Sequence, residues 1–281
     1  MITGKTKVAG VIGNPIEHSL SPPMHNAAYK QLKMDYVYVA FRIEKEDLPK
    51  VIESAKTMGL VGLNVTIPYK TDIIEYLDEI DETARQINAV NTISFKNGVA
   101  KGYNTDGTGA IKSIEKYTTV KSRNVLVLGA GGASKAITFT LINHGINRLI
   151  IANRSKDNAF QLIDNLKRQT GFEDISYIEI AEADRILDDV DIIINTTPIG
   201  MYPNVDVDTP IRTDKINESH VVMDVIYNPL ETKLLKEAKD NGATTVSGTN
   251  MLINQGITAF EIFTGRTPTY ESFEKALLDQ L

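Results

Sequence analysis

Polar residues suited to binding a hydroxylated molecule form four short clusters in the first part of the chain, where apolar strands would be expected simply to turn. The clusters are Ser19–Ser21, Asn64–Lys70, Ala89–Thr92 and Asn104–Gly107. Ligands bind at the strand ends of open α/β sheets, and hydroxyl and amide groups gathered there suit a ligand with several hydroxyls. Taken singly, these residues have structural alternatives, since Ser21 or Asp106 could cap a helix and Asn91 could belong to a turn.

Two of the clusters place polar residues two positions apart. Ser19 and Ser21 precede Pro22, which favours an extended backbone before it, so both hydroxyls are expected on one side of the chain. Asn64 and Thr66 are expected on one face of a strand by the same period of two. The spacing therefore predicts pairs of polar groups that face the same way.

A glycine-rich segment lies between a short apolar run, Val125–Leu128, and a predicted helix. Its residues are Gly129, Ala130, Gly131, Gly132 and Ala133. Glycines at such a turn let a pyrophosphate approach backbone N–H groups at the positive end of the helix, as in dinucleotide-binding proteins. Ser134 stands where the motif usually has its third glycine, and glycine-rich turns also occur without a ligand. The segment thus predicts a dinucleotide site, with a simple structural turn as the alternative.

The residues after the next predicted strand, Arg148–Ala152, bear on which dinucleotide fits. They are Asn153, Arg154, Ser155 and Lys156. NAD sites usually place an acid here for the ribose hydroxyls, whereas NADP sites place an arginine for the 2′-phosphate. Arg154, assisted by Lys156, therefore favours NADP. The alternatives are that both are solvated charges at the start of a helix, and that Asp157 turns toward a ribose.

The composition argues against several classes of protein. The 281 residues include no cysteine, which rules out disulfides and thiolate metal sites. A net charge of −6 without a basic run argues against nucleic-acid binding. No apolar run approaches about 20 residues and the N-terminus lacks signal-peptide features, so we expect a cytoplasmic protein without a membrane segment. No metal site is expected, because metal-ligand spacing is missing among the histidines, His18, His25, His144 and His220.

Apolar β-branched runs alternate with amphipathic stretches along the chain, which predicts an α/β fold with a mostly parallel sheet covered by helices. One series of strands ends in a hairpin around Asn97-Gly98, expected at the edge of its sheet, and a second series starts near Lys121. At this length two domains are the natural expectation. The last two predicted helices, Met251–Thr264 and Tyr270–Leu278, follow the second series and could return to the first domain.

Taken in order, these motifs resemble the shikimate dehydrogenase family. In the first part of the chain the resemblance rests on Asn14-Pro15, His18 to Pro22, His25-Asn26, Asn64 to Pro68, Lys70, Ala89 to Thr92 and Gly102 to Gly107. Later it rests on Gly129 to Ala133, Asn153 to Ser155, Asn195 to Met201, Asp224 to Pro229, Gly248 to Leu252 and Gln255. The matches run from about residue 7 to residue 265. Ser247, where the family often has an acid, is a departure that puts only a local contact in doubt.

The resemblance implies two α/β domains. A mixed, mostly parallel substrate-binding (catalytic) domain would comprise residues 1–106 and 247–281, and a Rossmann-type NADP-binding domain residues 107–246. The implied substrate contacts are Ser19, Ser21, Asn64, Thr66, Lys70, Asn91, Asp106, Tyr227 and Gln255. Beyond the glycine-rich segment and residues 153–156, the implied cofactor contacts are Thr197, Met201, Ile226, Gly248 and Met251. A homodimer is also what the family leads one to expect.

The implied activity is the reversible, NADPH-dependent reduction of 3-dehydroshikimate to shikimate, in the shikimate (chorismate) pathway of aromatic amino acid biosynthesis. Reducing a ketone leaves negative charge on its oxygen, which Lys70 would stabilise while Asp106 holds the ammonium group and a substrate hydroxyl. This electrostatic role of Lys70 is favoured over a strict general-base role. Two alternatives stay open: an NAD-using quinate/shikimate dehydrogenase, and a ligand-sensing regulator that keeps the scaffold without turnover.

Overall fold

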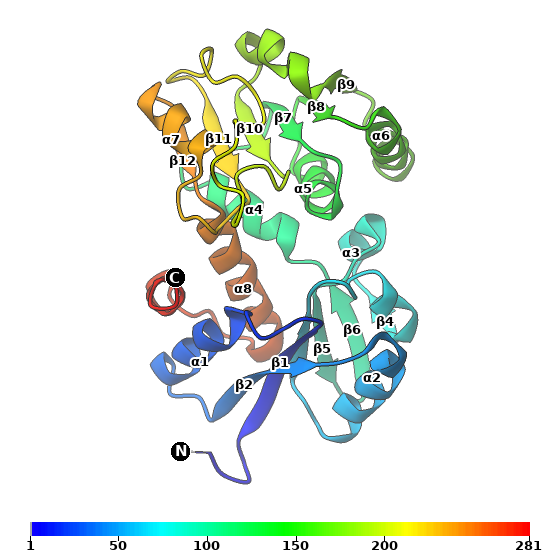
Figure 1. The fold of residues 1–281 in the computed structure, drawn as a ribbon. Coiled ribbons are helices and arrows are strands. Elements are labelled where there is room, and N and C mark those ends of the chain that lie inside the picture. Colours follow the sequence, from blue (N-terminus) through cyan, green and yellow to red (C-terminus); the bar gives the residue numbers. More distant parts are fainter. Residues whose placement is uncertain (1) are drawn as a thin grey trace. The chain divides into compact units, whose positions relative to one another are not determined.

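The computed structural model describes residues 2–281, which form two compact units (Figure 1). Among the described residues, unit 1 comprises residues 2–105 and Ile253–Leu281, and unit 2 comprises Asp106–Leu252. In Figure 1, unit 1 takes the blue to cyan part of the chain with its brown and red end, and unit 2 the green to orange part. The unit boundaries lie close to the expected domain boundaries, whose functional assignment stays a prediction.

Unit 1 is built on a six-stranded mixed sheet in the order β2-β1-β3-β5-β6-β4. Its strands are β1 (Lys7–Gly13), β2 (Tyr36–Arg42), β3 (Gly62–Val65), β4 (Glu79–Ile80), β5 (Thr92–Lys96) and β6 (Val99–Tyr103). The first three run parallel, β5 is antiparallel to both β3 and β6, and β4 runs parallel to β6. The hairpin β5–β6 turns at Asn97 and Gly98, both with positive φ, as expected. The hairpin does not form the edge of the sheet, because β4 pairs with the outer side of β6.

The helices of unit 1 bury apolar stripes against this sheet. They are α1 (Ser21–Gln31), α2 (Leu48–Thr57), α3 (Glu82–Ile87), α9 (Tyr270–Leu278) and part of α8 (Gly248–Thr264), with short 3₁₀ helices η1 (Lys45–Asp47) and η2 (Asp72–Tyr76). In α2, for example, Leu48, Ile52 and Ala55 are buried at helical spacing. Helix α1 contacts both β2 and α9, which ties the C-terminal helix to the N-terminal part of the unit. The last helices of the chain therefore return to the first unit, as expected.

Unit 2 is an all-parallel sheet in the order β12-β11-β10-β7-β8-β9. The strands are β7 (Asn124–Leu128), β8 (Arg148–Asn153), β9 (Ile175–Glu179), β10 (Ile192–Asn195), β11 (Val221–Asp224) and β12 (Thr244–Val246). They alternate with α4 (Asp106–Ile114), α5 (Gly132–Asn143), α6 (Lys156–Thr170), the 3₁₀ helix η3 (Ile180–Asp189) and α7 (Lys233–Asp240). The predicted α/β class, with one mixed and one Rossmann-type sheet, is confirmed.

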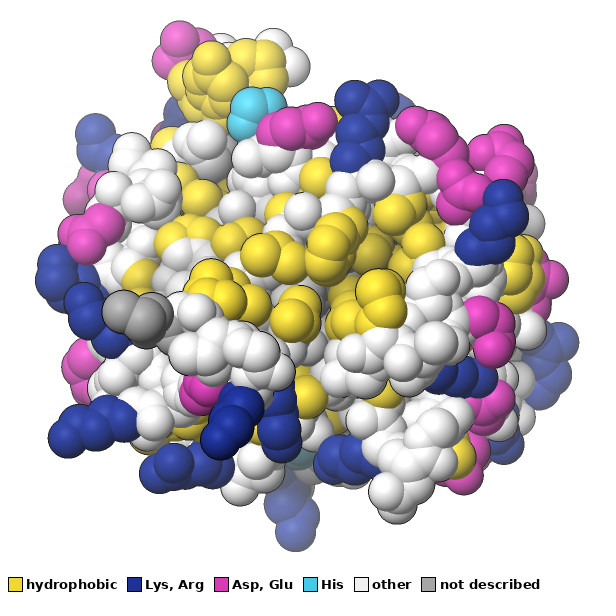
Figure 2. Space-filling view, turned by 90° about the horizontal axis from the view of Figure 1, so that it is seen from below, with side chains coloured by type: hydrophobic (Ala, Val, Ile, Leu, Met, Phe, Trp, Pro, Cys, Tyr) yellow, Lys and Arg dark blue, Asp and Glu magenta, His cyan; other side chains and the backbone are white. Residues whose placement is uncertain are grey.

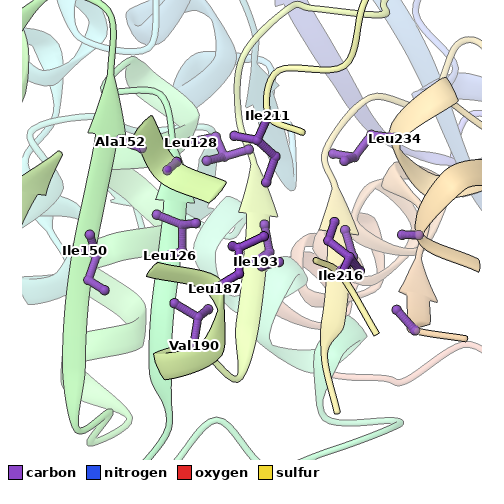
Figure 3. Packing of buried hydrophobic residues seen from close by; sticks show 14 of the residues in the cluster. Leu126, Leu128, Ile150, Ala152, Leu187, Val190, Ile193, Ile211, Ile216 and Leu234 are labelled. Atoms are coloured by element: carbon purple, nitrogen blue, oxygen red, sulfur yellow. The ribbon is translucent and has the colours of Figure 1, made fainter. Parts of the chain in front are cut away.

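Continuous apolar runs explain why this second sheet is buried on both faces. Leu126, Ile150 and Ile193, from three neighbouring strands, point into one layer of the core together with Leu187 and Leu234 from the covering segments (Figure 3). The chain moves outward from β7 through β8 to β9, and then returns to add β10, β11 and β12 on the other side. The strand order thus reverses between β7 and β10, and a ligand is expected at the carboxyl ends of these strands.

None of the helices within residues 2–281 is long and apolar enough to span a bilayer.

Candidate active site

The four polar clusters follow or precede strands of unit 1 at one end of its sheet, and the last of them continues into unit 2 from Asp106 onward. Strands β1 and β3 end there, β5 starts there because it runs antiparallel to β3, and β6 ends there in turn. Asn64 pairs with Val11 on one side and with Thr92 on the other. The topology therefore brings together segments that are far apart in the sequence, as the strand-end argument requires.

Asn64 lies at the centre of this end, with 8% of its surface exposed. Its Nδ2 donates hydrogen bonds to the carbonyl oxygen of Asn91 at 3.1 Å and to Oγ1 of Thr92 at 3.0 Å. Its Oδ1 accepts a hydrogen bond of 2.6 Å from the hydroxyl of Tyr38. Both amide hydrogens are used within the protein, so one lone pair of Oδ1 is left for a ligand.

Asn91 is buried beside it and is joined to Gln255 through Thr105. The Asn91 Oδ1 accepts hydrogen bonds from the backbone N–H of Thr105 and from Oγ1 of Thr92, both at 2.9 Å. Its Nδ2 donates to Oγ1 of Thr105 at 3.0 Å, and that Oγ1 lies 3.3 Å from Oε1 of Gln255. Asn91 is therefore part of a buried polar network, at a bend of the chain just before β5.

Ser19 and Ser21 lie together, but not for the predicted reason. The backbone is not extended here: Leu20 is in the right-handed helical region, and α1 begins at Ser21. Two prolines follow in the first turn of α1, where their fixed φ favours a helix, and this preference overrides the bias against helix before a proline. The backbone N–H of Ser21 donates to Oγ of Ser19 at 3.4 Å, so the two residues are still neighbours. The first turn has no side-chain cap, so Ser21 is not the helix cap of the alternative.

The other predicted substrate residues of these clusters follow strands β3 and β6. Thr66 and Lys70 come after β3, and Asp106 comes after β6. The backbone N–H of Thr66 donates to the carbonyl oxygen of Ile12, which extends the pairing of β1 and β3 by one residue. The Lys70 carbonyl oxygen accepts a hydrogen bond of 2.7 Å from the N–H of Val90, which ties the Lys70 segment to the Asn91 cluster. Asp106 is the first residue of α4, where a carboxylate is stabilised by the helix dipole. All three side chains are half-buried.

The glycine-rich turn of unit 2 contains glycines that the backbone requires and glycines with free space at the Cβ position. Gly129 has a φ of +105°, and a Cβ there would lie 2.6 Å from Oγ1 of Thr196. By contrast, a Cβ on Gly131 or Gly132 would meet nothing within 4 Å. Space against backbone N–H groups at the start of α5 is what a pyrophosphate needs, so the residues fit a dinucleotide. Ser134 is buried and its hydroxyl donates to the Gly129 carbonyl at 2.8 Å, which explains why a serine replaces the third glycine.

The predicted phosphate-reading residues lie in the open at the end of β8. Asn153 holds the turn by donating from Nδ2 to the Ser155 carbonyl at 2.8 Å, and Oγ of Ser155 accepts from the N–H of Asn158 to cap α6. Arg154 is exposed and forms no ion pair with any described residue. Lys156 is also exposed, and its Nζ lies 5.5 Å from the centre of the Phe160 ring. An unpaired arginine at this strand end fits the 2′-phosphate of NADP.

A buried carboxylate supports the loop after β10. Asp224 accepts hydrogen bonds from Nδ2 of Asn195, the N–H of Ile226 and Oγ1 of Thr232, and burial raises the pKa of its carboxyl group. Oδ1 of Asn195 in turn accepts from the N–H and the hydroxyl of Thr197, at 3.0 and 2.7 Å. The Thr197–Met201 loop is therefore anchored at its first residue.

The remaining predicted residues of this part of the chain differ in exposure. Met201, a predicted cofactor contact, is 46% exposed, and Tyr227, a predicted substrate contact, is 41% exposed, so both present side-chain surface to a ligand. The side chain of Ile226 is buried, so only its backbone could line a site. A Cβ on Gly248 would clash with the carbonyl oxygen of Ile226, so close backbone packing explains the glycine. Met251, in the first turn of α8, is half-buried.

Comparison with known proteins identifies the family. Residues 11–93 match the shikimate dehydrogenase substrate binding domain, residues 112–224 match shikimate / quinate 5-dehydrogenase, and residues 248–278 match the shikimate 5′-dehydrogenase C-terminal domain. The chain belongs to the shikimate dehydrogenase family. It is 69% identical over 281 residues to a shikimate dehydrogenase (NADP(+)) of Methanosphaera stadtmanae, covering 100% of this chain and 99% of that protein.

Two solved structures with this fold contain different nicotinamide cofactors. A crystal structure of a shikimate dehydrogenase in complex with NADP+ is 49% identical, with a TM-score of 0.92 over 99% of this chain and 97% of that one. A quinate dehydrogenase from Corynebacterium glutamicum in complex with NAD is 31% identical, with a TM-score of 0.89 over 98% of this chain and 99% of that one. The fold alone therefore does not choose the cofactor, and the residues after β8 must do so.

Three residues of the unit 1 site were missed by sequence reasoning: Tyr38, Thr92 and Thr105. Thr92 and Thr105 lay inside predicted clusters, but the family resemblance implied contacts only from their neighbours Asn91 and Asp106. For Tyr38 the single sequence holds no signal, because a tyrosine in a strand is ordinarily a core residue.

Proposed function

We propose that this chain is an NADP-dependent shikimate dehydrogenase that catalyses the reversible reduction of 3-dehydroshikimate to shikimate, in the shikimate (chorismate) pathway of aromatic amino acid biosynthesis. The observation that carries the proposal is the full-length match to an enzyme of that name. Lys70, Asp106 and Arg154 are all present at the positions where the family resemblance requires them.

In this proposal residues 1–106 with 247–281 form the substrate-binding (catalytic) domain and residues 107–246 form the cofactor-binding domain, with bounds that differ by a few residues from those of units 1 and 2. The substrate contacts are Ser19, Ser21, Asn64, Thr66, Lys70, Asn91, Asp106, Tyr227 and Gln255. The cofactor contacts are residues 129–133 and 153–156, with Thr197, Met201, Ile226, Gly248 and Met251. The shared strand end of unit 1 and the open glycines of unit 2 support this division.

NADP, when bound, supplies or accepts the hydride. Lys70 stabilises the negative charge that develops on the substrate oxygen, because a lysine ammonium group is charged at neutral pH. Asp106 orients that ammonium group and accepts a hydrogen bond from a substrate hydroxyl. Asn64 and Asn91 bind further hydroxyl groups of the substrate, so the shikimate ring is held in one position relative to Lys70.

The nearest alternative, an NAD-using quinate/shikimate dehydrogenase, differs in two measurable preferences. Steady-state kcat/KM should be measured for shikimate and for quinate, each with NADP and with NAD. The proposal expects the highest value for shikimate with NADP, because Arg154 replaces the acid that NAD sites carry. A higher value for quinate with NAD would replace the proposal with that alternative.

The same proposal places the enzyme in the cytoplasm as a homodimer. Hydrophobic side chains gather across the middle of one face, with charged side chains of both signs around them (Figure 2), and such a patch suits a second copy of the chain. Sedimentation of the purified protein at the mass of two chains would support the dimer, and sedimentation at the mass of one chain would contradict it.

A further inference from the structure

Tyr38 is held more firmly than an ordinary core residue. It lies in the middle of β2 and is 1% exposed. Its ring stacks on the buried ring of His25, with centroids 4.2 Å apart and planes 13° from parallel. Its backbone N–H and carbonyl oxygen both bond to the side-chain amide of Asn26, at 2.9 and 2.8 Å, because this face of the edge strand has no neighbouring strand. The position of the Tyr38 hydroxyl is therefore fixed.

That hydroxyl contacts a residue assigned to the substrate. It donates a hydrogen bond to Oδ1 of Asn64 at 2.6 Å. Burial raises the pKa of the Tyr38 hydroxyl well above its ordinary value. At neutral pH the hydroxyl therefore keeps its proton, and it is a donor to Asn64.

The orientation of the Asn64 amide follows from its neighbours. If the amide were turned over, its oxygen would face the carbonyl oxygen of Asn91, which is a repulsive contact, and the Tyr38 hydroxyl would lose the oxygen that accepts its proton. The Asn91 carbonyl therefore excludes the turned-over amide, and the hydrogen bond from Tyr38 holds the side chain in the remaining orientation. In that orientation the group left to a ligand is one lone pair of Oδ1, which can accept a hydrogen bond from a hydroxyl.

We propose that Tyr38 is a positioning residue that acts through Asn64: its hydroxyl fixes the Asn64 side chain so that Oδ1 accepts a hydrogen bond from a substrate hydroxyl. This inference rests on the proposed function and on the assignment of Asn64 to the substrate site. It adds a residue that neither the motifs nor the clusters include.

Tyr38→Phe tests the inference, because it removes only the hydroxyl. KM for shikimate should rise about 10-fold, the effect of one lost hydrogen bond, with kcat within about twofold and KM for NADP unchanged. Tyr29→Phe is the matched control. Tyr29 is also 1% exposed and lies beside the same histidine ring, but its buried hydroxyl has no hydrogen-bond partner in the described chain. This control should leave all three constants unchanged.

Asn64→Ala and the double variant Tyr38→Phe/Asn64→Ala decide whether Tyr38 acts through Asn64. Asn64→Ala should raise KM for shikimate, and adding Tyr38→Phe to it should change little. If Tyr38→Phe raised KM for shikimate by the same factor in the Asn64→Ala variant as in the wild type, the inference would be overturned. The effect of Tyr38 would then not pass through Asn64. An unchanged KM in Tyr38→Phe would also overturn it, while the function would stand as long as the wild type oxidises shikimate.

Two further results keep the test decisive. An unchanged KM in Asn64→Ala would overturn the assignment of Asn64 and the role of Tyr38 with it. If Tyr38→Phe folds poorly, Thr92→Val removes the acceptor of the Asn64 amide on its other side, 3.0 Å away. KM for shikimate should then rise in the same way, and an unchanged KM in this variant would contradict the inference.

Discussion

At the scale of single residues, the proposed reaction depends first on the charge of Lys70. Removing one group that stabilises a developing oxyanion typically lowers the rate about 10²- to 10³-fold. Lys70→Ala should therefore lower kcat at least about 100-fold while calorimetry still detects shikimate binding. Lys101→Ala is a control in the same unit, because Lys101 pairs with Glu79 outside the site, and it should leave kcat unchanged. A variant at Lys70 that loses only substrate affinity would show that this lysine merely positions the ligand.

Cofactor choice is the second prediction at this scale, and it concerns Arg154. A charge-assisted hydrogen bond contributes about 1.5–3 kcal/mol, or about 10- to 150-fold in affinity. Arg154→Ala should weaken NADP by this factor and leave NAD nearly unchanged, and Arg154→Glu should weaken NADP further by repulsion. The measurement is kcat/KM with each cofactor at one ionic strength.

Arg168→Ala is the control and should have no effect, because Arg168 is an exposed arginine in the last turn of α6, the helix that begins two residues after Arg154. Equal losses with both cofactors in Arg154→Ala would show that Arg154 does not bind the 2′-phosphate. Asp157 acting on the ribose would then be the better hypothesis.

At the scale of elements, the turn between β7 and α5 contains one glycine expected to serve cofactor binding and another that the fold requires. Gly131 has an ordinary φ of −89° and open space at its Cβ position, so Gly131→Val should keep the fold. The added side chain should block the pyrophosphate and abolish dinucleotide binding, while shikimate still binds to unit 1. Calorimetry with each ligand separately makes the measurement.

Gly129→Ala at the same turn is the contrasting variant. Its φ of +105° and the 2.6 Å approach to Thr196 predict a lower melting temperature. If Gly131→Val lost both ligands and unfolded like Gly129→Ala, the open space at Gly131 would have no connection with the cofactor.

The elements themselves were largely predictable from hydrophobic patterns. Helix α9 (Tyr270–Leu278) has the predicted bounds, and the predicted runs Val125–Leu128 and Arg148–Ala152 each fall one residue short of strands β7 and β8. The extended backbone predicted at Ser19 to Ser21 was wrong, because the preference of proline for the first turn of a helix prevails there. The two-residue strand β4 was missed, since its pairing with β6 depends on tertiary contact and not on a local pattern.

At the scale of the whole molecule, residues from distant segments form each part of the site. The candidate residues after strands could be chosen from the sequence, because parallel strands end at one edge of a sheet whatever their separation. Their hydrogen-bond partners could not, since the bond of Tyr38 to Asn64 joins residues 26 positions apart and depends on the register of β1 with β2 and β3. A single sequence carries no record of that register.

The central claim, that this chain turns over shikimate and does not merely bind it, is tested by the absorbance of reduced nicotinamide. Purified protein mixed with shikimate and NADP+ should produce reduced nicotinamide, with one shikimate consumed for each reduced cofactor. The rate should fall in proportion when the protein is diluted. If calorimetry showed binding of both ligands but no reduced cofactor accumulated over hours at high protein concentration, the account would be contradicted, and the chain would be a ligand-sensing protein on a dehydrogenase scaffold.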